Sequence, residues 1–129
     1  MTHDPRPDVA VVDDDVAVLD SFKFMLEMAG FVVATYPSAI AYLQHQGMDP
    51  RCLILDQHMP EMTGLELTTR LRADGVTIPV LLVTSASSPA IVASATRMGI
   101  IRVLDKPPNA EELISFVNGC ERPADRPPP

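Results

Sequence analysis

The chain has 129 residues, of which 47% are hydrophobic, 5% aromatic and 21% charged. This length and apolar content predict one domain with a single hydrophobic core. Ten basic against 17 acidic residues give a formal net charge of −7, which argues against direct nucleic acid binding by this domain, because such binding needs a basic face.

The cysteines and the hydropathy bear on cellular location. Cys52 and Cys120 lie far apart in the sequence and form no metal-ligand pattern with the three histidines. We therefore expect a reducing compartment, with neither a disulfide framework nor a structural zinc site. The longest apolar runs, such as 78–83, are too short to span a bilayer, and the first eight residues carry no signal-peptide pattern. These features predict a cytoplasmic protein without membrane attachment.

Six of the 13 prolines lie near the two ends of the chain, where they favour extended, poorly packed conformations. We therefore predict a disordered N-terminal extension over residues 1–8, a folded domain over 9–120, and a Pro-rich tail or linker over 121–129.

Within the domain, the first predicted strand is Val9–Val12. A helix over Val16–Ala29 follows, with apolar residues on one face, and Gly30 ends it. The second predicted strand is Phe31–Thr35, and Ser38 is the predicted N-cap of the helix after it.

The third predicted strand is Cys52–Leu55, and a helix begins after Gly64. The fourth strand, Pro79–Val83, is followed by a helix that starts with Ser88-Pro89 as N-cap and first helical residue and ends at Gly99.

The fifth predicted strand is Ile100–Leu104, and a capping-box-like segment at Asn109 starts the last helix. Its predicted core side consists of Leu113, Ile114, Val117 and Cys120. Three of the strands are almost wholly apolar, as expected of strands covered on both faces. Five strands alternating with five helices predict an α/β fold with a doubly wound parallel sheet.

Polar residues follow four of the strands: Asp13-Asp14-Asp15, then Asp56, then Thr84-Ser85, then Asp105-Lys106-Pro107. In doubly wound folds the chemistry lies beyond the carboxyl ends of the strands. Massed carboxylates repel one another unless they share a cation, and Mg²⁺ prefers oxygen ligands. Asp56 is then a candidate nucleophile forming an acyl phosphate, with Lys106 and Thr84 as partners of the phosphoryl oxygens.

Each residue alone has a simpler interpretation. The run 13–15 is consistent with a helix cap, Asp56 with a turn residue, Thr84 with a cap of the fourth helix, and Lys106 with an ordinary surface lysine. Their joint placement at strand ends favours a site.

Four segments in order resemble the receiver domain of bacterial two-component response regulators: 11–15, 53–64, 82–85 and 104–107. The resemblance covers nearly all of residues 8–120 and is nearest to receivers of the FixJ kind, which precede LuxR-type helix-turn-helix domains. It implies a flavodoxin-like (βα)5 three-layer sandwich with sheet order 2-1-3-4-5.

The resemblance also implies roles for single residues. Asp56 matches the phosphoacceptor, which takes a phosphoryl group from a phosphohistidine on a sensor histidine kinase or histidine phosphotransfer protein. Asp14, Asp56 and the backbone carbonyl of His58 match direct Mg²⁺ ligands, whereas Asp13 matches a carboxylate that holds the ion through water.

In the same resemblance, Thr84 matches the switch hydroxyl that moves to the phosphoryl group. Lys106 matches the lysine of the site, and its bond to Pro107 is typically cis in the family. The domain is then no enzyme, except that it catalyses its own phosphorylation and autodephosphorylation at Asp56.

Three positions depart from the family pattern. Val103 stands where a Tyr or Phe often swings inward on activation. Ala86 and His58 stand where side chains tune hydrolysis of the phospho-aspartate, and Pro108 stands where a bulky apolar residue is common. The output surface is then expected at the loop after Thr84 and at the fourth helix.

The fourth helix is small and apolar for a surface element. Packing against the sheet explains this composition; the alternative is a docking face, shared with Val103 and the fifth helix, for a phosphorylation-dependent homodimer or an output domain. Two other functions stay open: a Mg²⁺-dependent aspartyl-phosphate phosphohydrolase and a non-phosphorylated interaction module.

Overall fold

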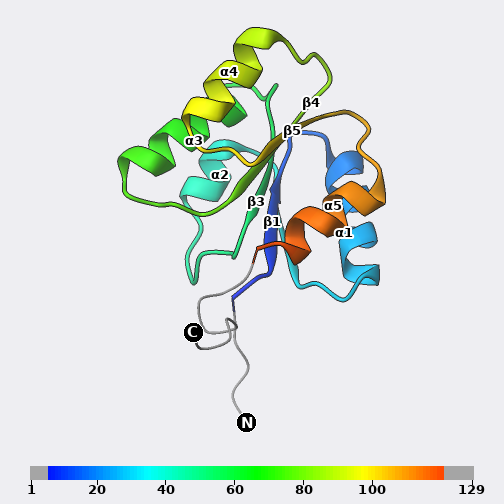
Figure 1. The fold of residues 1–129 in the computed structure, drawn as a ribbon. Coiled ribbons are helices and arrows are strands. Elements are labelled where there is room, and N and C mark those ends of the chain that lie inside the picture. The colour runs from blue at the N-terminus through cyan, green and yellow to red at the C-terminus, as the bar shows by residue number, and fades with distance from the viewer. Residues whose placement is uncertain (1–5, 121–129) are drawn as a thin grey trace, which may run out of the picture.

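Five strands and five helices alternate along residues 6–120, the part of the chain that the computed structural model describes (Figure 1). They are β1 Val9–Val12, α1 Val16–Met28, β2 Val33–Tyr36, α2 Ala39–Leu43, β3 Leu53–Asp56, α3 Gly64–Ala73, β4 Val80–Thr84, α4 Pro89–Arg97, β5 Arg102–Asp105 and α5 Ala110–Asn118. All strand pairs are parallel, in the order β2-β1-β3-β4-β5. The predicted doubly wound, three-layer fold and its strand order are therefore confirmed.

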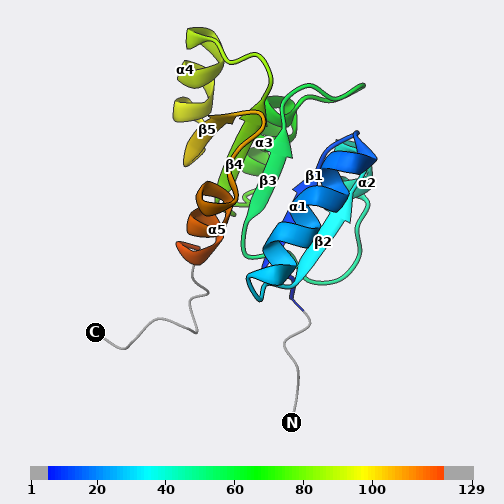
Figure 2. The same ribbon diagram turned by 90° about the vertical axis from the view of Figure 1, so that its right-hand side faces the viewer.

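The helices form two layers that sandwich the sheet. Figures 1 and 2 show α1 and α5 on one face and α2, α3 and α4 on the other. Successive residues of a strand point to opposite faces, so Val9 and Val11 pack with α1 and α5, whereas Ala10 and Val12 pack with the other layer. Burial on both faces explains why the three inner strands, β1, β3 and β4, are almost wholly apolar.

Four strands begin later than the sequence predicted: β3 and β4 by one residue, and β2 and β5 by two. At the end of α1, Gly30 has a φ of 96° and its N–H bonds to the carbonyl of Glu27, while the N–H of Phe31 bonds to the carbonyl of Leu26. This is a Schellman motif, in which the first apolar residue after the glycine completes the helix end. Ile100 does the same after Gly99 by bonding to the carbonyl of Ala95. The predicted strand starts at residues 31 and 100 were therefore wrong.

The predicted helix starts are confirmed. Ser38, Ser88 and Asn109 are N-caps whose side chains accept backbone N–H groups of α2, α4 and α5. A reciprocal capping box also joins Thr63 and Glu66 at the start of α3. That pair was readable from the sequence as Thr-x-x-Glu but was not predicted.

The predicted terminal segments fall mostly outside the described residues, so the assignments for 1–8 and 121–129 stay predictions. Within the described part, the carboxylate of Asp8 accepts the N–H of Val32 at 2.7 Å and pairs with Arg51 at 2.6 Å. Among residues 6–120, no helix has the length and apolarity needed to cross a membrane.

Candidate functional site

Three carboxylates meet at the carboxyl edge of the sheet. Asp13 follows β1 and Asp56 ends β3, and these strands are neighbours. One ligand atom from each of Asp13, Asp14 and Asp56 lies within 4.8 Å of the others. Asp13 and Asp56 are 2% and 5% exposed, whereas Asp14 is open to solvent. The predicted cluster is therefore present, with one member facing water.

Lys106 lies between the two buried carboxylates. Its Nζ is 2.8 Å from Oδ2 of Asp13 and 3.2 Å from Oδ1 of Asp56. The backbone N–H of Lys106 donates to the carbonyl of Thr84, which holds the loop after β5 against the end of β4. The bond from Lys106 to Pro107 is cis, as the resemblance implied.

The charges of this site perturb one another. Burial raises the pKa of Asp56, the negative charge of Asp13 raises it further, and the ammonium of Lys106 opposes both without cancelling them. Burial alone lowers the pKa of Lys106, but the hydrogen bond and charge of Asp13 and the charge of Asp56 outweigh burial, so the pKa is raised. One ammonium therefore does not fully compensate this acidic edge.

Asp15 does not join the cluster. Its carboxylate accepts the N–H of Ala17 at 2.9 Å and caps α1. The N–H of Asp15 in turn donates to Oδ1 of Asp13 at 2.9 Å, which fixes that carboxylate at the strand end. The helix-cap interpretation of the acidic run is thus correct for Asp15.

Thr84 and His58 flank the cluster. Thr84 is fully buried at the end of β4, and its Oγ1 accepts the N–H of Ala86 at 3.1 Å. The backbone N–H of His58 points to Oδ1 of Asp56 at 3.4 Å, while its side chain is exposed. A ligand role for the carbonyl of His58 stays a prediction.

The loop between β3 and α3 contains residues that the sequence analysis missed. Gln57 is buried, and its Oε1 accepts the N–H of Leu65 at 2.9 Å. A Cβ on Gly64 would lie only 2.6 Å from the carbonyl oxygen of Asp56, so this glycine permits close approach of α3 to the site. Glu61 has a φ of 71°, which is uncommon for a residue with a side chain. None of these positions has a signal in residue type alone.

The donor set fits a hard divalent cation. Three carboxylates that can converge on one point supply oxygen ligands, and Asp14 keeps an open side toward solvent. Burial and, after it, the negative charge of Asp13 raise the pKa of Asp56, and a shared cation would relieve both effects.

Comparison with known proteins agrees with this geometry. The response regulator receiver domain family matches residues 9–118. The chain belongs to this family. It is 31% identical over 118 residues to the transcriptional regulatory protein FixJ of Bradyrhizobium diazoefficiens, a match that covers 91% of this chain and 58% of that protein. The receiver domain thus spans little more than half the length of this relative.

Solved structures support the same assignment. The chemotaxis protein CheY4 of Vibrio cholerae superimposes with a TM-score of 0.79 at 28% identity, covering 88% of this receiver domain and 97% of CheY4. A structure titled FixJ-N gives a TM-score of 0.76 at 29% identity and covers 91% of this chain and 93% of that one. The receiver domain is a two-component signalling domain, whose family works with histidine kinases.

Two of the positions that depart from the family pattern, Val103 and Pro108, pack against apolar neighbours. Val103 is half-buried and packs with the core on the α2, α3 and α4 side of the sheet. Pro108 is buried and lies with Val18 and Phe22 around a small apolar pocket. Its ring therefore supplies apolar surface where the family commonly has a bulkier apolar side chain.

In α4, only Ala95 is buried and Val92 is 44% exposed; Ile91 and the C-cap residue Met98 pack partly against the core. Packing therefore explains part of the apolar composition of α4, and an apolar surface is left over. The predicted inward side of α5 is confirmed: Leu113, Val117 and Cys120 are buried, and Ile114 is partly buried against the same core. Phe116 is also buried there.

Proposed function

We propose that Asp56 is the phosphoacceptor of this receiver domain and takes a phosphoryl group from a phosphohistidine on a sensor histidine kinase or histidine phosphotransfer protein. The observation that carries the proposal is the placement of buried Asp56 beside both Asp13 and Lys106, with the Lys106 ammonium 3.2 Å from its Oδ1. A carboxylate flanked by a cation and by further carboxylates suits nucleophilic attack at phosphorus.

Mg²⁺ is the proposed cofactor. Asp14, Asp56 and the backbone carbonyl of His58 would hold the ion directly, and Asp13 would hold it through water. When bound, the ion neutralises negative charge on the phosphoryl oxygens. Lys106, already paired with Asp13 and Asp56, supplies the second positive charge from the chain itself.

In the proposed transfer, a carboxylate oxygen of Asp56 forms the bond to phosphorus as the bond from phosphorus to the histidine nitrogen breaks. Asp56 must be ionised to attack, and Lys106 favours that form against burial and the charge of Asp13. Thr84 is the proposed switch. Without phosphorylation its hydroxyl oxygen accepts the N–H of Ala86; after phosphorylation the hydroxyl would turn to a phosphoryl oxygen and release the β4–α4 loop.

The proposed response is a change of contacts at α4, Val103 and α5, which leads to a homodimer or to docking of an output domain. Exposed Val92 and the exposed small residues Ala90 and Ala93 support a close helix approach there. We place the domain in the cytoplasm, where sensor kinases would meet it, and propose no direct nucleic acid or membrane binding by the domain itself. Crosslinking or solution scattering before and after phosphorylation tests the dimer, which an unchanged monomer would rule out.

Incubation with Mg²⁺ and acetyl phosphate tests the phosphoacceptor. We expect intact-protein mass spectrometry to show one added phosphoryl group, absent from Asp56→Asn. Asp15→Asn is the matched control, because Asp15 is adjacent to the acidic cluster in sequence but caps α1, a role that Asn fills equally well. This control should be phosphorylated like the wild type.

The same experiment separates the alternatives. Steady release of inorganic phosphate far beyond one equivalent per chain would indicate the phosphohydrolase. No mass gain with any phosphodonor would indicate the interaction module. Phosphorylation that persists in Asp56→Asn would show that another residue is the acceptor.

A further inference from the structure

Two buried thiols lie together at the end of the sheet opposite the acidic site. Cys52 immediately precedes β3, and Cys120 follows α5. Both belong to the hydrophobic core on the α1 and α5 face, and both are free thiols. Because they are distant in sequence, the fold alone brings them together.

Each of the two thiols donates a hydrogen bond to a backbone carbonyl. The Sγ of Cys52 donates to the carbonyl of Asp8 at 3.4 Å, and the Sγ of Cys120 donates to the carbonyl of Phe116 at 3.2 Å. Arg51, the residue before Cys52, donates to the backbone carbonyl of Cys120 at 2.9 Å, and both thiols belong to the same core cluster, so the two side chains are neighbours. When Cys120 loses its proton, the S–H of Cys52 can therefore turn from Asp8 to the new thiolate.

The surroundings distinguish the two sulfurs. The hydrogen bond from Cys52 lowers the pKa of the Cys120 thiol, and the guanidinium of Arg51 lowers it further against the effect of burial. Arg51 is held beside Cys120 by a 2.9 Å hydrogen bond to its backbone carbonyl. The contact with Cys120 and burial raise the pKa of Cys52. The surroundings therefore favour the thiolate form at Cys120 more than at Cys52.

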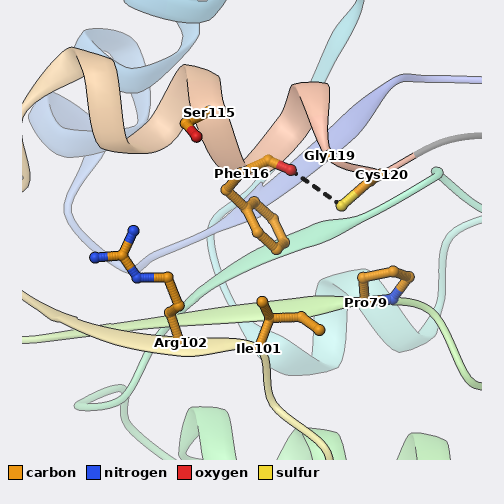
Figure 3. A pocket seen from close by; sticks show the side chains of 7 residues that line it. All are labelled: Pro79, Ile101, Arg102, Ser115, Phe116, Gly119 and Cys120. Atoms are coloured by element: carbon orange, nitrogen blue, oxygen red, sulfur yellow. Dashed lines mark hydrogen bonds between the residues drawn. The ribbon is translucent and has the colours of Figure 1, made fainter.

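Solvent reaches only one of them through a pocket. A pocket of about 250 Å³ lies between the start of β5 and the end of α5, and Cys120 is part of its lining (Figure 3). Figure 3 shows Phe116 on the helix side and Ile101 and Pro79 on the strand side. Cys52 is 0% exposed and is absent from the lining. A small oxidant in this pocket meets Cys120 first.

We propose that Cys120 and Cys52 form a redox modification site, in which a peroxide oxidises Cys120 and Cys52 then closes an intramolecular disulfide. The thiolate of Cys120 attacks one peroxide oxygen, the O–O bond breaks, and the leaving hydroxide takes up a proton to give water and a sulfenic acid. The sulfur of Cys52 then attacks the sulfenic sulfur, the S–O bond breaks, and the departing hydroxide takes the Cys52 proton as a second water.

In total, one peroxide is reduced by two electrons to two waters, and the two thiols are oxidised by two electrons to one disulfide. The product joins the segment that follows α5 to the residue that precedes β3. In a reducing compartment the dithiol is the resting form, and thiol–disulfide exchange restores it after oxidation.

The test uses the reduced 129-residue chain, which is exposed to hydrogen peroxide, then unfolded and alkylated with N-ethylmaleimide. For the wild type we expect the intact mass to fall by two hydrogen atoms, no maleimide uptake at either cysteine, and a peptide that links Cys52 to Cys120. Dithiothreitol should restore both thiols. The oxidised form should unfold at a higher urea concentration than the reduced form, because the crosslink constrains the unfolded chain.

Two serine variants test the order of events. Cys52→Ser should stop at a Cys120 sulfenic acid that dimedone traps, whereas Cys120→Ser should keep Cys52 reduced, because Cys52 is enclosed. Two wild-type results would overturn the proposal without any variant: both cysteines still alkylated after peroxide exposure, or disulfide-linked dimers in place of the internal crosslink. Asp56→Asn should oxidise like the wild type, so this test is independent of the proposed phosphoacceptor.

Discussion

Replacing Gly64 by alanine tests how closely α3 must approach the candidate phosphoacceptor. The added Cβ would lie 2.6 Å from the carbonyl oxygen of Asp56 and 2.6 Å from Cδ1 of Leu82, well inside van der Waals contact. The Leu82 side chain can rotate away, but the Asp56 carbonyl belongs to a central strand. The N-terminus of α3 must therefore shift, which weakens the 3.2 Å hydrogen bond from the N–H of Gly64 to the carbonyl of Gln57.

Overpacking of this kind costs about 1–3 kcal/mol. The lower backbone entropy of alanine in the unfolded chain returns about 0.4–1 kcal/mol. We expect Gly64→Ala to lower the free energy of unfolding by about 1–2 kcal/mol in urea denaturation, or the melting temperature by roughly 4–8 °C. It should also slow phosphorylation by acetyl phosphate, because the shift of α3 disturbs the β3–α3 loop beside Asp56.

Gly119→Ala is the matched control. Its Cβ meets its nearest neighbours, the carbonyl oxygens of Phe116 and Ser115, at 3.5 Å, and its φ of −76° suits alanine. This variant should be as stable as the wild type or up to about 1 kcal/mol more stable. If the Gly64 and Gly119 variants have the same stability, the steric argument is refuted.

Three further predictions concern single side chains. Because the pKa of Asp56 is raised, its ionised form disfavours folding, and Asp56→Asn should unfold at a higher urea concentration than the wild type at neutral pH. This difference in stability should shrink as the pH falls through the raised pKa of Asp56. Mg²⁺ should raise the melting temperature of the wild type far more than that of the variant. Arg51→Met removes donors from the Asp8 carboxylate and the Cys120 carbonyl and should cost about 1–3 kcal/mol in urea denaturation, whereas a loss as small as that of exposed Arg97→Met would contradict this. Thr63→Ala removes the capping box of α3 and should cost about 1 kcal/mol by thermal denaturation, with Thr69→Ala, in the exposed middle of the same helix, costing less.

Sequence patterns located the secondary structure because the interactions that define it are local. The caps at Ser38, Ser88 and Asn109 each use a side chain and an N–H group three residues ahead. The glycines at 30 and 99 end their helices as predicted, but the same local motif takes up the next apolar residue, so the strands after them start later. An apolar residue at that position looks the same in sequence whether it closes a helix or opens a strand.

The candidate site was predictable to the extent that it follows from strand order. Once parallel strands are neighbours, the residues at their carboxyl ends must meet, which brings Asp13 and Asp56 together. Lys106 follows β5, two strands away from β3, and its long side chain reaches both carboxylates. Sequence order alone could not distinguish the roles within the acidic run, because Asp14 and Asp15 are adjacent and chemically identical. The start of α1 decides their roles: Asp14 contributes to the acidic cluster, and Asp15, the residue before α1, caps the helix.

The sequence by itself determined the alternation of strands and helices, the helix caps and the chemistry available at the strand ends, since periodicity and capping act over a few residues. Only the tertiary structure decided that Gln57 and Gly64 hold α3 against Asp56, and that Cys52 and Cys120 are neighbours in the core. Those contacts depend on how the helices pack on the sheet, which places groups distant in sequence within a few ångströms of each other. The separation of two residues along the sequence does not predict such distances.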